Sequence, residues 1–232
     1  MVQSLAVRHK NETLTLNHVQ EIVEQLAGRD RLGEIISAVH HIPAREAKFA
    51  PMPQWIRAEL AAVYAERGVA ELYSHQAATA AIVHEGRNVV VVTPTASGKT
   101  LCYNLPVLNS VLENPDTRAL YLFPTKALAQ DQLAELHDLS ARLDHRFGVF
   151  AYDGDTPTDA RKAIRERGHI VLSNPDMLHT GILPHHTRWQ RLFENLRYVV
   201  LDELHTRNSF APRQPLRIRA NWPSALRKPN SM

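Results

Sequence analysis

One stretch, residues 87–103, restricts the possible folds more than any other part of the sequence. It reads RNVVVVTPTASGKTLCY, in which four consecutive valines precede a loop of small residues and the triplet Gly-Lys-Thr. An unbroken apolar run of this kind is typical of a strand buried on both faces of a parallel sheet. A strand, a small-residue loop, Gly-Lys-Thr and a helix, in this order, predict a phosphate-binding P-loop. We therefore expect an α/β fold in which helices flank a parallel sheet.

The predicted loop supplies the groups that a triphosphate needs. Gly98 lets the backbone approach closely, Lys99 provides a cation, and the Thr100 hydroxyl can hold Mg²⁺. The usual first glycine of the motif is replaced by Thr93, so on these residues alone a strand-to-helix turn without a ligand stays open. The expected nucleotide-binding residues of the loop are Thr95, Ala96, Ser97, Gly98, Lys99 and Thr100.

A second pair of functional residues follows the apolar run 197–201, which reads as a strand. The run ends in Asp202 and Glu203, about 100 residues after the P-loop. Paired carboxylates at a strand end often form only a polar turn. In a chain with Gly-Lys-Thr, however, they indicate the second half of an ATPase site, in which Asp202 holds Mg²⁺ through water and Glu203 orients and deprotonates the attacking water.

Between and before these two motifs, the periodicity predicts alternating helices and strands. Gln76, in the first turn of a helix that Ser74 is expected to cap, lies 17 residues before Thr93. Its amide could match the donor and acceptor of adenine, although a residue at such a position is often only part of a helix cap. Helices are expected at 17–28, 32–39, 53–68, 74–86, 125 onwards, 157–167 and 189–195, and further strands at 118–123, 147–151 and 169–173.

Composition limits the class of protein. No apolar run approaches the roughly 20 residues of a membrane span, and the N-terminus lacks the apolar core of a signal peptide, so a cytoplasmic location is expected. The single cysteine, Cys102, cannot form a disulfide framework and is expected to be a buried structural thiol. Six of the 27 basic residues and none of the 24 acidic residues lie in 206–232, so the remaining 205 residues are mildly acidic.

Six sequence blocks, in order, carry a resemblance to a known family: YSHQ, TPTASGKT, FPTKALAQDQ, YDGD, LSNPDML and DELH. The chain resembles the first RecA-like motor domain of a superfamily 2 DEAD/DEAH-box helicase, a P-loop NTPase, from about Leu72 to His205. In such helicases Thr or Ala commonly replaces the first P-loop glycine. The segment HIPARE at 41–46 and the form YSHQ are more similar to the bacterial mitomycin-repair type and its fungal relatives.

The resemblance implies a role for each matched residue. ATP and Mg²⁺ would be the cofactors. Gln76 would read adenine, and Lys99 and Thr100 would hold phosphate and Mg²⁺. Asp202 and Glu203 would carry out ATP hydrolysis. His205 would couple the ATP state to the nucleic acid. The residues expected to contact one nucleic-acid strand, taken to be single-stranded DNA, are Pro124, Thr125, Lys126, Gly154, Pro175 and Asp176.

The expected organisation has three parts: a small N-terminal helical extension (1–68), an incomplete RecA-like domain (69–205) and a basic, proline-rich tail (206–232). Helicases of this kind have a Ser-Ala-Thr block and a second RecA-like domain after DExH, and neither is present in the sequence. We therefore expect a truncated or frameshifted reading frame. The strand before Ser-Ala-Thr would lie between the P-loop strand and the DExH strand, so its loss would leave a gap in the sheet.

Two functional hypotheses follow. The first is the ATP-binding motor domain of an ATP-dependent DNA helicase. The narrower resemblance implies a role in DNA repair and movement of the helicase along DNA from 3′ to 5′. The second is a nucleotide-binding fragment without productive turnover, because the second domain is missing. A small-molecule kinase would not need FPTKALAQDQ or SNPDML. Nucleic-acid binding by the basic tail alone is a further alternative.

Overall fold

The computed structural model describes residues 21, 22, 25, 46–94 and 97–203. The chain divides into two compact units, residues 1–46 and residues 47–232. The helices predicted at 17–28 and 32–39 lie almost entirely outside the described residues, and so do Thr95, Ala96, His205 and the tail. Among the helices that the structure describes, none has both the length and the apolar content needed to cross a membrane.

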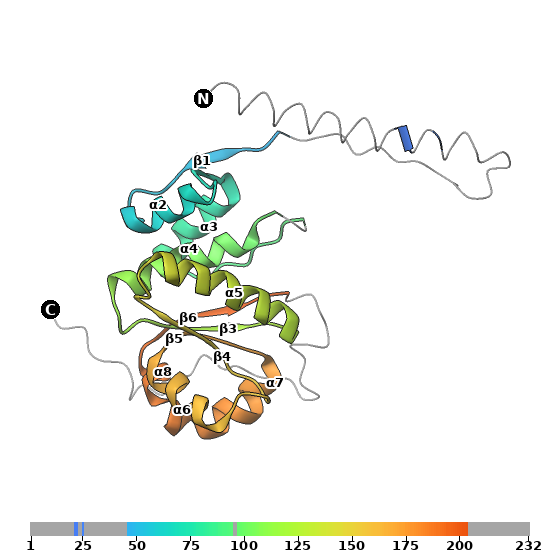
Figure 1. Cartoon of the computed structure of the whole chain (residues 1–232). Helices are drawn as coiled ribbons and strands as arrows, with labels where there is room; N and C mark the ends of the chain where they lie inside the picture. The colour runs from blue at the N-terminus through green and yellow to red at the C-terminus, as the bar shows by residue number, and fades with distance from the viewer. Residues whose placement is uncertain (1–20, 23–24, 26–45, 95–96, 204–232) are drawn as a thin grey trace. The chain divides into compact units, whose positions relative to one another are not determined.

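A four-stranded parallel sheet forms the centre of the second unit (Figure 1). The spatial order of its strands is β4-β5-β3-β6, and every neighbouring pair is parallel. Parallel neighbours require crossover connections, which the intervening helices supply. The predicted fold class, a RecA-like parallel sheet flanked by helices, is confirmed. The strands are β3 (Arg118–Leu122), β4 (Gly148–Ala151), β5 (Gly168–Ser173) and β6 (Leu196–Leu201).

Helices cover both faces of this sheet (Figure 1). On one face lie α4 (Lys99–Glu113) and α5 (Lys126–Arg142). On the opposite face lie α6 (Thr158–Arg167) and α8 (Gln190–Glu194). The predicted helix at 189–195 is thus confirmed in a shorter form.

Alternation along β3 explains why there are two apolar cores. All five of its residues are buried, as expected for a central strand. Ala119 and Tyr121 belong to the core that includes α4 and α5, whereas Leu120 and Leu122 belong to the core on the opposite face, which includes Trp189. Successive side chains of a strand point to opposite faces, so each helical layer is packed against alternate residues of one strand.

A pair of short antiparallel strands precedes the sheet and was not predicted. It pairs β1 (Phe49–Pro51) with β2 (Glu71–Tyr73), and α2 (Ala58–Glu66) lies between them in the sequence. Leu60 of α2 is fully buried in the same core as residues of α4. β2 leads directly into α3 (Ser74–His84), so the antiparallel strand pair fixes the start of this helix.

The prediction of a buried strand at Val89–Val92 is wrong for this structure. The segment forms no strand, and Val90 and Val92 are 72% and 89% exposed. A strand needs a hydrogen-bonded neighbour, and no strand among the described residues pairs with the outer edge of β6. Val199 of β6 is accordingly 54% exposed. This open edge is where the sequence predicted a gap in the sheet.

The connection from β5 to α8 is a run of short helical turns. It begins with α7 (Pro175–Met177), continues as the π-helical turn η1 (Leu178–Ile182) and ends as the 3₁₀ segment η2 (Leu183–Trp189). Ile182 and Trp189 are buried against the sheet and anchor this connection.

Candidate functional site

The Gly-Lys-Thr segment begins α4 as predicted. Gly98 is the N-cap, with a left-handed φ of 73°, and no side chain caps the first turn of the helix. The Lys99 ammonium donates to the carbonyl oxygens of Thr93 (3.1 Å) and Pro94 (3.0 Å). The hydroxyls of Thr93 and Ser97 lie 2.6 Å apart. The loop is therefore folded around its own lysine, and the uncapped N–H groups of α4 are suited to an anion.

The start of α3 is connected to this loop by hydrogen bonds. Gln76, which is buried, accepts from the Tyr73 N–H (2.8 Å) and donates to the Gly98 carbonyl (2.9 Å). A ring nitrogen of His75 lies 3.1 Å from the Ser97 carbonyl oxygen. The predicted N-cap Ser74 is instead the first helical residue, because Tyr73 takes the extended cap conformation. That Gln76 reads adenine stays a prediction.

Gly98 also has no room for a side chain. A Cβ atom at this position would lie 2.5 Å from the amide nitrogen of Gln76. A glycine is thus required both by the positive φ and by the close approach of α3.

The carboxylate pair lies at the carboxyl end of β6. The Asp202 N–H donates to the Leu122 carbonyl oxygen (3.1 Å), which continues the β3–β6 ladder by one residue. The Glu203 N–H donates to the Asp202 carboxylate (2.9 Å), and Glu203 has a left-handed φ of 53°. A positive φ at a residue other than glycine is uncommon and concentrates at functional sites.

Tyr103 joins the two halves of the site, and sequence reasoning missed it. Its hydroxyl lies 3.3 Å from the Asp202 carboxylate and 3.4 Å from the side-chain oxygen of Gln132 in α5. Burial raises the pKa of this hydroxyl well above its ordinary value, and the Asp202 charge raises it further, so Tyr103 remains a donor. Its position four residues after Lys99, on the same face of α4, was the available signal.

The residues predicted to contact nucleic acid lie in the loops that follow the carboxyl ends of β3, β4 and β5. Thr125 is the N-cap of α5 and accepts from the Leu128 N–H (3.3 Å). Asn174 caps α7 in the same way through the Met177 N–H (2.7 Å). The Ser173 hydroxyl donates to the Tyr152 carbonyl (2.7 Å), which ties the β4 loop to the β5 loop.

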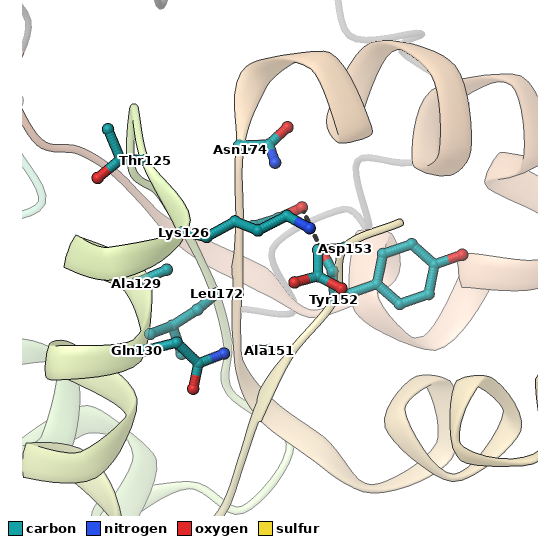
Figure 2. Close-up of a pocket in the computed structure, with 10 residues that line it drawn as sticks. Thr125, Lys126, Ala129, Gln130, Ala151, Tyr152, Asp153, Leu172 and Asn174 are labelled. Atoms are coloured by element: carbon teal, nitrogen blue, oxygen red, sulfur yellow. Dashed lines mark hydrogen bonds between the residues drawn. The ribbon is translucent and has the colours of Figure 1, made fainter. Parts of the chain in front are cut away.

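An ion pair between Lys126 and Asp155 connects the β3 loop to the β4 loop. Its hydrogen bond raises the pKa of Lys126 and lowers that of Asp155. Figure 2 shows the Lys126 side chain extending from the start of α5 towards Asp153, over a pocket between α5 and the strand ends. The structure thus brings Thr125, Lys126 and the Gly154 loop together. Pro124, Pro175 and Asp176 lie in the loops at the same edge.

This combination of fold and site defines a class of protein. A parallel sheet in which a Gly-Lys-Thr helix start and an Asp-Glu strand end are joined through Tyr103 is the nucleotide-binding domain of a P-loop NTPase. Residues 73–217 match the model of the DEAD/DEAH box helicase family. The chain belongs to this family.

Curated relatives support the same assignment. The chain is 52% identical over 186 residues to the uncharacterized ATP-dependent helicase YprA of Bacillus subtilis, covering 80% of this chain and 24% of that protein. It is 38% identical over 195 residues to the ATP-dependent helicase hrq1 of Schizosaccharomyces pombe, covering 82% of this chain and 18% of that protein. The bacterial and fungal matches confirm the narrower resemblance. The chain spans about a quarter of the length of these relatives or less.

Solved structures give the same result. The crystal structure of the DUF1998 helicase MrfA bound to DNA and AMPPNP matches with a TM-score of 0.76 at 52% identity, over 81% of this chain and 26% of MrfA. The helicase Lhr of Mycobacterium smegmatis, bound to single-stranded DNA and AMP-PNP, shares the fold with a TM-score of 0.57 at 24% identity, over 67% of this chain and 21% of Lhr.

Proposed function

We propose that this chain is the ATP-binding motor domain of an ATP-dependent DNA helicase. The observation that carries the proposal is the hydrogen bond from Tyr103 of α4 to Asp202. It joins the helix that begins with Gly-Lys-Thr to the strand that ends in Asp-Glu, although 99 residues separate its two partners. This contact supports the assignment of both segments to one ATPase site.

The loop residues fit the phosphates of ATP. Lys99 now donates to two loop carbonyls, and phosphate oxygens would be stronger acceptors for the same ammonium. The bare first turn of α4 would donate N–H groups to the same anion, and Gly98 keeps its approach clear. We assign Gln76 to the adenine edge and the segment 95–100 to the phosphates.

The carboxylates supply the groups for hydrolysis. Glu203 would orient the attacking water and accept its proton, while Asp202 would be held in place by Tyr103. Thr100 and Asp202 would be the residues that hold Mg²⁺, which when bound neutralises phosphate charge. His205 would couple the site to the nucleic acid.

The loops after β3, β4 and β5 would bind one strand of DNA. Thr125 and Asn174 cap helix starts at this edge, and Lys126 provides a positive charge there. The MrfA and Lhr structures contain DNA, and we extend this partner to the present chain. The same proposal includes binding to single-stranded DNA, a cytoplasmic location and a role in DNA repair. It also includes a second RecA-like domain that completes the ATP site. Within the chain, the proposed parts are the helical extension 1–68, the RecA-like domain 69–205 and the basic tail 206–232.

One observation favours a second function. Val90 and Val92 are exposed, so the segment before the P-loop is not held in the sheet beside β6. A P-loop supported by α3 and by its continuation into α4 would still bind nucleotide. It would not hold the phosphates against Glu203 well enough for turnover, and the chain would then be a nucleotide-binding module.

Equilibrium binding tests the proposal. A fluorescent ATP analogue with Mg²⁺ and a labelled oligothymidylate are titrated separately into the purified chain. We expect both to bind, with nucleotide binding lost in Lys99→Ala and oligonucleotide binding weakened in Lys126→Ala. Failure of both ligands to bind would contradict the motor function, whereas nucleotide binding without oligonucleotide binding would favour the second function.

A further inference from the structure

A pocket on the opposite face of the sheet from α4 and α5 has no role in the site described above. It lies between α6 and the segment from Met177 to Trp189, which are both on that face in Figure 1. Its volume is about 380 Å³, which is within the range of pockets that bind small ligands. The residues that line it, hereafter the arginine pocket, are Tyr152, Thr158, Arg161, Arg165, Met177, Thr180, Gly181, His185, Arg188 and Trp189.

The charge of this lining is entirely positive. Three of the ten residues are arginines, and no carboxylate is among them. Within the described part of the chain, the side chains of Arg165 and Arg188 make no hydrogen bond or ion pair. Both also line an adjoining hollow that includes Glu166 and Glu194, but Glu166 pairs with Lys162 (3.9 Å) and Glu194 accepts from the Gln190 amide (2.7 Å). Two guanidinium groups therefore border a pocket that offers them no anion.

The third arginine, Arg161, is held in place by hydrogen bonds and forms part of the pocket wall. Arg161 donates to the carbonyl oxygens of Thr156 (2.9 Å) and Gly154 (3.3 Å) and lies over the ring of Tyr152. Tyr152 in turn packs edge-on against Trp189, with 4.7 Å between ring centroids. These buried rings form a closely packed base for the pocket, so its arginines could contact a ligand without a large rearrangement of the protein.

The arginine pocket adjoins the loops proposed to bind DNA. Tyr152 lines both this pocket and the pocket beneath Lys126. Arg161 holds the Gly154 carbonyl, and Met177 directly follows Asp176 in the chain. A strand that contacts Gly154 and Asp176 would thus reach the arginine pocket without leaving the protein surface.

We propose that the arginine pocket binds a backbone phosphate of the DNA strand, through Arg165 and Arg188. The inference rests on the proposed function, because it assigns a further contact to the same nucleic-acid partner. Arginine presents planar pairs of N–H groups that match phosphate oxygens, and no carboxylate lines the arginine pocket itself. Free phosphate offers the same chemistry, and the experiment distinguishes the two sources.

The test compares two double variants of the full chain with equal loss of charge. Arg165→Gln with Arg188→Gln removes the two arginines of the pocket, and Lys162→Gln with Arg167→Gln removes two other positive charges of α6 that do not line it. Affinity for a labelled oligothymidylate is measured by fluorescence anisotropy between low and moderate salt. Binding of a fluorescent ATP analogue confirms that each variant is folded.

We expect the pocket variant to bind the oligonucleotide about tenfold more weakly, with the slope of log affinity against log salt reduced by about 0.7, as for one lost single-strand phosphate contact. The control variant should stay near the wild-type values. A methylphosphonate placed at successive positions of the oligonucleotide should weaken wild-type binding at one position that no longer matters in the pocket variant.

Three outcomes would overturn the inference. Equal affinity of the pocket variant and the control variant would reject the pocket and leave the proposed function intact. Calorimetric binding of inorganic phosphate that needs both arginines, with unchanged oligonucleotide affinity, would assign the pocket to a free anion. Absence of oligonucleotide binding by the wild-type chain would reject the inference together with the DNA-binding part of the proposed function.

Discussion

The hydroxyl of Tyr103 lies 3.3 Å from the carboxylate of Asp202 and thereby connects the first turns of α4 to the end of β6. Because α4 begins at Lys99, this one side chain relates the predicted phosphate-binding residues to the predicted hydrolytic ones. Lys99 itself donates to the carbonyl oxygens of Thr93 and Pro94, so its link to Asp202 runs through the shared helix α4 and Tyr103.

Replacing Tyr103 with Phe should lower kcat for ATP about tenfold, since a hydrogen bond to a charged group that positions it is lost. KM should change little, because Lys99 and Gly98 remain. Tyr121→Phe is the matched control, since its hydroxyl donates to Asn104 (3.1 Å) and not to Asp202. Steady-state kinetics and thermal unfolding of both variants check this. An equal loss of kcat in Tyr121→Phe would reduce the role of Tyr103 to packing.

Asp155→Asn should tighten binding of single-stranded DNA about threefold, in the range of an exposed ion pair. The carboxylate of Asp155 now pairs with Lys126 and competes with any phosphate that approaches this ammonium. Asp138→Asn removes the same charge from a surface pair with Arg142 (3.0 Å) and should have a smaller effect. Anisotropy titrations at constant salt measure the difference. Weaker binding by Asp155→Asn would show that the ion pair instead orders the loop for DNA.

Gly98→Ala should reduce nucleotide affinity more than tenfold. Its Cβ would displace the Gln76 amide, 2.5 Å away, and with it the loop held by α3. Gly86 has a similar φ of 75° with no atom within 4 Å of a Cβ. Gly86→Ala should therefore cost ~1 kcal/mol of stability from backbone strain alone and leave nucleotide binding unchanged. Equal nucleotide affinity in the two variants would contradict the close approach as the cause.

Stability should decrease as the pH falls below about 6.5, the ordinary pKa of histidine. Burial lowers the pKa of His169, and the charges of Arg118 and Arg191 lower it further. A ring nitrogen of His169 accepts from the Gly148 N–H (2.9 Å), which requires the neutral ring. The unfolded chain takes up the proton first, so folding is favoured above this pH and disfavoured below it.

Urea unfolding between pH 7.5 and pH 5.5 measures this dependence. His169→Gln should flatten it, while the same change at the exposed His179 should not. An unchanged pH dependence in His169→Gln would assign the effect to other groups.

The sequence predicted the four strands of the sheet well because they are short runs rich in apolar residues between helices, and strands at the centre of a parallel sheet are buried on both faces. It failed at Val89–Val92 for a physical reason. An apolar run indicates what can be buried, but a strand forms only where a neighbour is available, and β6 has an open edge among the described residues.

The site was predicted only in part. Motif spacing predicted that Lys99, Asp202 and Thr125 lie at the ends of helices and strands, and the structure has them there. Tyr103, the Lys126–Asp155 pair and the arginine pocket depend on contacts between segments that are distant in the sequence. The spacing of Tyr103 from Lys99 places both on one face of α4, but no local pattern encodes the contact with Asp202.

ATP turnover, with and without single-stranded DNA, tests the motor function most directly. The chain joined to a second RecA-like domain is compared with its Glu203→Gln variant in the same assay, with fluorescent-nucleotide binding measured on each sample. We expect turnover that DNA stimulates and that Glu203→Gln abolishes while nucleotide binding persists. Nucleotide binding with no turnover in either condition, even with the second domain present, would contradict the motor function and would leave the chain as a nucleotide-binding module.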